Sequence, residues 1–83
     1  MARILRLSTV LDRTGKTRSP LYADMAAGLF VRPIKLSARA AGWPEHEIDQ
    51  IIAARISGAD DKGIRKLVQR LHEARKTAVA NAA

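Results

Sequence analysis

The first apolar positions of the chain predict a short lead-in segment followed by a helix. Arginines interrupt the isoleucine and leucines of residues 3–7, a pattern that suits either an extended segment or the approach to a helix. Ser8 or Thr9 can cap a helix over roughly 9–14. Gly15 then ends it, because glycine adopts the left-handed conformation at little cost.

A second short helix is predicted between Ser19 and Gly28. Ser19 can cap its first turn, Pro20 suits the first helical position, and Gly28 can end it. Leu21 and Met25 are spaced i, i+4 and therefore share one buried face. The link from the first helix is only about three residues, which favours a bent turn between the two helices. Together the two segments predict a helix-turn-helix.

The middle of the chain changes to the period of a strand and predicts a small β-hairpin. Residues 29–31 form an apolar cluster that should pack under the second helix, and Pro33 excludes a central helix. Apolar and polar residues then alternate from residue 34 to 37. Residues 37–39 are short enough for a turn, and residues 40–43 can return as the second strand.

A longer helix is expected between Pro44 and Gly58. Three acids in or near its first turn are favoured there by the helix dipole and are more readily explained as helix-terminal charges than as catalytic groups: Glu45, Glu47 and Asp49. No nucleophile, partner base or metal cluster accompanies them, so we expect neither an enzyme nor a cofactor or metal. The expected buried face is formed by Ile48, Ile51, Ile52 and Ile56.

Asp60 and Asp61 can cap a last, amphipathic helix that runs to about Ala78. Residues 79–83 are expected to be a frayed tail. Basic residues dominate most of this helix, while one apolar stripe consists of Ile64, Leu67, Val68 and Leu71. The stripe can pack back on residues 1–58, pair with a second copy, or stay loosely attached. The domain organisation predicted is thus a compact unit over 1–58 followed by a helix over 59–78.

Composition restricts the class of protein. The chain has 83 residues and no cysteine, so it is one small domain without disulfides or thiolate metal sites. No apolar run approaches the roughly 18 residues that a membrane span needs. The N-terminal residues lack the pattern of a signal peptide. We therefore expect a cytoplasmic protein that does not act in a membrane.

The net charge of +7 is unevenly distributed. Residues 1–42 contain eight Lys or Arg and two acids, whereas residues 43–83 contain seven Lys or Arg and six acids. A basic domain can bind nucleic acid or an anionic membrane surface, because phosphates attract Lys and Arg and bound counterions are released. The same charge is also compatible with a merely solvated surface.

The order helix, turn, helix, hairpin, helix is that of a winged helix-turn-helix. The stretch TRSPLYADMAAGLFVRPIKLSARAAGWPEHEIDQIIAAR resembles the AlpA-like phage and prophage regulatory proteins, which are similar to excisionases and to the DNA-binding domains of MerR-type regulators. The resemblance spans roughly residues 5–56. It implies a mainly α fold with a hairpin wing, and DNA binding through the second helix and the wing. Ala23 departs from the family, which usually carries a basic residue there.

Candidate contacts with double-stranded DNA gather at the start of the second helix and on the hairpin, where Lys35 and Arg39 lie at or near the tip. Tyr22 can reach DNA or cover the edge of the core. Asp24 should lie away from DNA or pair with a neighbour such as Arg18. Trp43 is expected in the core. The predicted DNA-binding set is Lys16, Thr17, Arg18, Ser19, Tyr22, Lys35 and Arg39.

Three functions remain open at this stage. The first is a phage-type transcriptional regulator, and the second is an excisionase-like factor that bends DNA for a recombinase. Both use the same domain. The third is a protein-interaction module in which the basic surface meets an acidic partner and the last helix is the working part.

Overall fold

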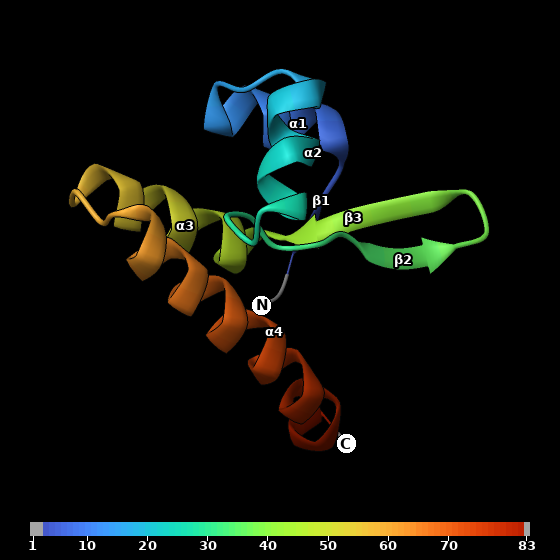
Figure 1. Ribbon diagram of the computed structural model, residues 1–83. Helices are drawn as coiled ribbons and strands as arrows, with labels where there is room; N and C mark the ends of the chain where they lie inside the picture. The colour runs from blue at the N-terminus through green and yellow to red at the C-terminus, as the bar shows by residue number, and fades with distance from the viewer. Residues whose placement is uncertain (1–2, 83) are drawn as a thin grey trace.

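The computed structural model describes residues 3–82, with side chains described as far as Thr77. The chain folds into four helices and a three-stranded antiparallel sheet (Figure 1). This confirms the predicted mainly α, winged-helix-like fold. The elements in chain order are β1 (Ile4–Leu5), α1 (Leu7–Thr14), α2 (Arg18–Ala26), β2 (Ile34–Ser37), β3 (Ala40–Pro44), α3 (Glu45–Ile56) and α4 (Asp61–Ala82).

The hairpin is present where the alternating pattern predicted it, and the N-terminal segment joins it as a third strand. β3 lies in the middle of the sheet, with β1 on one side and β2 on the other. Leu5 pairs with Trp43, and both side chains are buried. A side chain at Gly42 would collide with Ile4, which requires glycine at this crossing. Past the end of β1, the sheet consists of β2 and β3 alone. These two strands form the wing, which projects to the right in Figure 1.

The stops of the first two helices were predicted correctly, but their starts were not. Gly15 and Gly28 have positive φ angles of 71° and 78° and follow α1 and α2. α1 begins at Leu7, so Ser8 lies inside it and is not its cap. α2 begins at Arg18 with Thr17 as its extended N-cap residue, so Ser19 is likewise helical. Within the described chain neither helix has a side-chain capping bond, so a polar residue marked each start only approximately.

The core is formed by side chains from both halves of the chain. Trp43 is 2% exposed, which confirms its predicted buried position. Phe30 and Val31 are buried beside it, as expected for the apolar cluster after α2. Ile48 and Ile51 of α3 are buried as well. The prediction for Ile56 was wrong, because this side chain is 82% exposed. Ile56 is the last residue of α3, and the chain turns away after it through Gly58, which has a φ angle of 91°.

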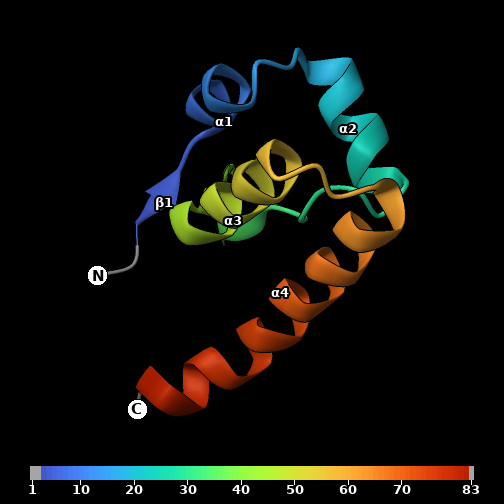
Figure 2. The same ribbon diagram turned by 90° about the vertical axis from the view of Figure 1, so that its left-hand side faces the viewer.

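α4 packs back on its own chain, which is the first of the three arrangements considered for it. Asp60 caps its first turn by accepting a hydrogen bond from the N–H of Gly63 at 2.8 Å. Figure 2 shows α4 running beneath α3, with α1 and α2 above. The helix continues through 79–82, where we expected a frayed tail, and residue 83 lies outside the described residues. Three stripe residues are buried and one is partly buried: Ile64, Val68 and Leu71, with Leu67 at the edge.

Candidate nucleic-acid interface

The turn between α1 and α2 presents the start of α2 to solvent. The N–H of Gly15 donates to the carbonyl of Leu11 at 2.9 Å and closes α1. The first backbone bond of α2 runs from the N–H of Leu21 to the carbonyl of Thr17 at 3.2 Å. Arg18 and Ser19 precede that bond, so their N–H groups have no carbonyl partner inside the helix. Free amides and a cation at one exposed helix end form a surface suited to phosphate.

One exposed face of α2 carries the predicted contact residues. Thr17, Arg18 and Ser19 are exposed, and Tyr22 is 50% exposed one turn after Arg18. Leu21 on the opposite face is fully buried. The tyrosine therefore does not belong to the core, and its hydroxyl is free to meet a ligand on the same side as Arg18.

Lys16 differs from the other predicted residues because its charge is already engaged. Its Nζ lies 2.6 Å from Oδ2 of Asp24, and both side chains are partly covered. Asp24 was expected to lie away from DNA or to pair with a neighbour such as Arg18, and the neighbour with which it pairs is Lys16. The ion pair ties the inter-helix turn to the second turn of α2, and it leaves Arg18 unpaired among the described residues.

The wing carries two further predicted cations. Lys35 lies on β2 opposite Ala41, and Arg39 lies in the turn that joins β2 to β3. Both are exposed. The register shifts between Lys35 and Ser37, so the hairpin is irregular near its tip. Leu36 within this irregular segment is 46% exposed.

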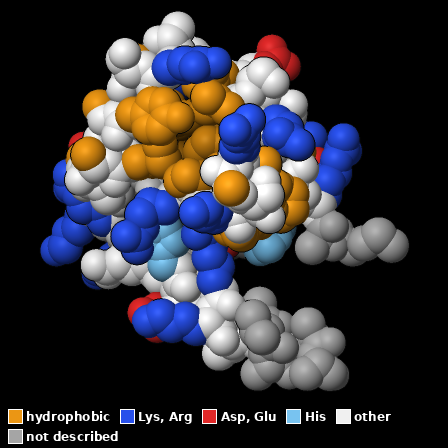
Figure 3. Space-filling view, turned by 90° about the vertical axis from the view of Figure 1, so that its right-hand side faces the viewer, with side chains coloured by type: hydrophobic (Ala, Val, Ile, Leu, Met, Phe, Trp, Pro, Cys, Tyr) orange, Lys and Arg blue, Asp and Glu red, His pale blue; other side chains and the backbone are white. Residues whose placement is uncertain are grey.

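Among the described residues, acids pair with six of the Lys and Arg side chains, and none of these six lies on the wing. Figure 3 faces the wing and shows Lys and Arg side chains bordering an area of hydrophobic side chains. Lys35 and Arg39 form no ion pair within the described residues, and neither do Lys66 and Arg70 on α4. Besides the pair of Lys16, ion pairs join Arg3 to Glu45, Arg13 to Glu45 and Asp49, Arg55 to Asp61, Arg75 to Glu47, and Lys76 to Glu73.

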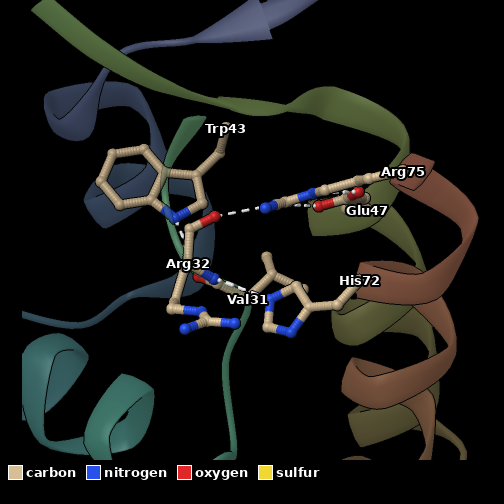
Figure 4. Close-up of polar contacts among 6 residues, drawn as sticks. All are labelled: Val31, Arg32, Trp43, Glu47, His72 and Arg75. Carbon is tan, nitrogen blue, oxygen red and sulfur yellow. Dashed lines mark hydrogen bonds and ion pairs between the residues drawn. The ribbon is translucent and has the colours of Figure 1, made fainter. Parts of the chain in front are cut away.

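A polar cluster lies at the root of the wing, which is the segment just before β2 (Figure 4). This cluster was not predicted from the sequence. Glu47 was expected to be a helix-terminal charge and lies in the first turn of α3, but it is 1% exposed and accepts two hydrogen bonds from the guanidinium of Arg75. One of these bonds, from Nε to Oε2, measures 2.9 Å. Arg75 lies 28 residues further along the chain, so no local pattern announces this pairing. The only local sign is the position of Glu47 next to the buried Ile48.

His72 belongs to the same cluster. Its Nε2 accepts a hydrogen bond from the backbone N–H of Arg32 at 3.1 Å. Burial lowers the pKa of His72, and the nearby cations of Arg75 and Arg32 lower it further, while Glu47 acts in the opposite direction. The neutral imidazole, which can accept this bond, is therefore favoured.

Among residues 3–82, no group of three or more His, Asp or Glu side chains is arranged to hold a metal ion. No described helix is long and apolar enough to cross a membrane.

A helix-turn-helix followed by a β-hairpin wing places the protein among the winged-helix-like domains. The particular family follows from the sequence comparison. The chain belongs to the family described as "Prophage CP4-57 regulatory protein (AlpA)", whose model matches residues 3–56. This confirms the resemblance and identifies a phage-type regulatory protein. No match was found among curated proteins or among solved structures.

Proposed function

We propose that the protein is a sequence-specific, double-stranded DNA-binding regulator of the phage type. α2 would enter the major groove with Arg18, Ser19 and Tyr22 facing DNA, while Lys35 and Arg39 of the wing meet the adjoining backbone and minor groove. The observation that carries the proposal is the exposure of Arg18, Lys35 and Arg39 without acidic partners among the described residues, on the two elements that such folds direct at DNA.

The test is the salt dependence of binding to a DNA duplex. If about four to six phosphates are neutralised, log K should fall against log[salt] with a slope of about −4 to −5. A double variant, Lys35→Ala with Arg39→Ala, should make the slope shallower by about two, because each phosphate contact contributes close to one unit. Absence of duplex binding at low salt would refute the proposal.

A second function, an architectural factor that bends DNA, has one observation in its favour. Leu36 is 46% exposed between Lys35 and Ser37 on the wing. Apolar side chains inserted between base steps from the minor groove kink the duplex, and cations beside them hold the backbone. Energy transfer between dyes at the two ends of a duplex reports such a bend. Leu36→Ser should remove most of the bend while keeping the salt slope.

The third function, a protein-interaction module built on α4, has less support. The apolar stripe of α4 packs against its own chain. A partner that used Ile64, Val68 and Leu71 would first have to displace that packing.

A further inference from the structure

Both backbone groups of Arg32 are held by side chains of α4. The N–H of Arg32 donates to Nε2 of His72 at 3.1 Å, and its carbonyl accepts from Nη2 of Arg75 at 2.8 Å. Arg32 stands two residues before β2 begins at Ile34, so it is the root of the wing. On the preceding residue, the carbonyl of Val31 accepts a hydrogen bond from Nε1 of Trp43 at 3.0 Å. The chain is therefore fixed at its entry into the hairpin (Figure 4).

Arg75 is itself held rigidly. Its guanidinium makes a bidentate ion pair with Glu47 of α3, and only 2% of the Glu47 side chain is exposed. Bidentate charge-assisted bonds restrict orientation as well as distance. Nη2, which donates one hydrogen to Oε1 of Glu47, is thereby placed to direct its second hydrogen at the carbonyl of Arg32. α3, α4 and the wing root thus form one connected network.

The wing needs such an anchor. Its outer part consists of β2 and β3 alone, and a two-stranded hairpin is only marginally stable by itself. Its direction relative to α2 therefore depends on how its root is held. Sub-ångström displacements at a root become larger displacements at a tip, where Arg39 lies.

We propose that α4 is a positioning element for the wing, in which His72 and Arg75 fix Arg32 and so set the direction from which Lys35 and Arg39 meet DNA. The expected effect on DNA affinity rests on the proposed function, whereas the anchoring of the wing by α4 does not. The two side chains lie on α4, beyond the residues 3–56 that the family model covers. Positioning from α4 is therefore a feature of this chain that the family match does not describe.

The first experiment uses the protein without DNA. Protection factors from amide hydrogen exchange, measured by NMR, should fall in His72→Leu and in Arg75→Met for the amides within residues 32–37, which are those of Arg32 and of residues 34–37 because Pro33 has none. Amides of α2 should keep their protection. His72→Gln supplies a side-chain oxygen near the position of Nε2 and should restore protection at Arg32. Arg70→Met is the matched control, since it removes the same charge from the same helix without losing a polar contact among the described residues.

The second experiment is a pair of double-mutant cycles on duplex affinity. His72→Leu should weaken binding by about threefold to tenfold, the size of an effect transmitted through a coupled network. The loss should vanish in the background of the double variant Lys35→Ala with Arg39→Ala and persist in the Arg18→Ala background, because only the double variant has already lost both wing contacts. A role confined to overall stability would give the same loss in both backgrounds.

The outcomes separate this inference from the proposed function. If the parent protein does not bind DNA, the proposed function fails, and hydrogen exchange alone decides whether α4 holds the wing. Unchanged protection at 32–37 in a folded His72→Leu protein would overturn the inference, whatever the affinity for DNA. So would a loss of affinity equal in the two backgrounds. Arg75→Met leaves the buried Glu47 carboxylate unpaired, so if that variant fails to fold, His72→Leu carries the test.

Discussion

Arg18 and Arg39 present the same guanidinium group from two different elements. Arg18 lies at the start of α2, where a forked donor can reach a guanine edge or a phosphate, whereas Arg39 lies in the wing turn. Ala23 offers no polar group on α2, so direct base reading should be sparse. Arg18→Ala should therefore cost about 1–3 kcal/mol and relax discrimination if it contacts a base. Arg39→Ala should weaken binding to specific and random duplexes by similar factors.

Competition titrations with a matched and a scrambled duplex measure both effects. Neither arginine is part of the core, so thermal unfolding of the two variants should match that of the parent. If both variants bind like the parent, the DNA-binding surface lies elsewhere on the molecule.

His72 makes stability depend on pH. Its pKa is lowered in the folded state from a usual value of 6.5, first by burial and then by Arg75 and Arg32, against a smaller opposing effect of Glu47. The unfolded chain therefore binds the proton more readily. The contribution of His72 to the free energy of unfolding should be fully present above pH 6.5, and it should be lost as the pH drops from there through the pKa of the folded state.

Thermal melts of the parent and of His72→Gln across this range test the prediction. The variant has no titrating group at this position, so its curve should be flatter between pH 7.5 and about pH 5. Curves of equal slope would show that His72 does not titrate differently in the folded and unfolded states.

At the scale of elements, the sequence predicted what local chemistry determines. Gly15 and Gly28 end their helices because positive φ angles favour glycine, and that preference can be read from one residue. The start at Arg18 could not be read from the polar run around it, because Thr17 and Ser19 can each serve as a cap. The pairing of Glu47 with Arg75 could not be predicted at all, since it depends on α4 packing across the chain.

α4 should contribute a large part of the stability of the whole fold. Ile64 is fully buried, and Val68 and Leu71 are 3% and 6% exposed. A chain ending after Gly58 would expose their partners in the core, so it should melt at a lower temperature or fail to fold cooperatively. Thermal unfolding by circular dichroism measures the change.

A matched pair of point variants makes the same test within the full chain. Ile64→Ala should cost about 2–5 kcal/mol, as deletion of a buried isoleucine side chain does. Lys66→Ala on the exposed side of the same helix should change stability by less than about 0.5 kcal/mol. Equal melting temperatures for the two variants would contradict the packing of α4 on the domain.

At the scale of the whole molecule, charge and apolar surface are distributed differently. Most acids lie in the second half of the chain and pair with cations of α1, α3 and α4. The wing and the start of α2 retain unpaired cations among the described residues. The apolar stripe of α4, in contrast, is used internally. That stripe is therefore not available to a second copy.

This distribution predicts a monomer in the absence of DNA. A net charge of +7 opposes close approach of two copies, and a stable interface normally buries more than about 1,000 Å² with an apolar centre. Sedimentation in moderate salt should give the mass of one chain, 9.1 kDa, at all concentrations in the micromolar range. Ile56, which is 82% exposed, is the first position to test if a dimer is found. A dimer that Ile56→Ser dissociates would place the interface at the end of α3.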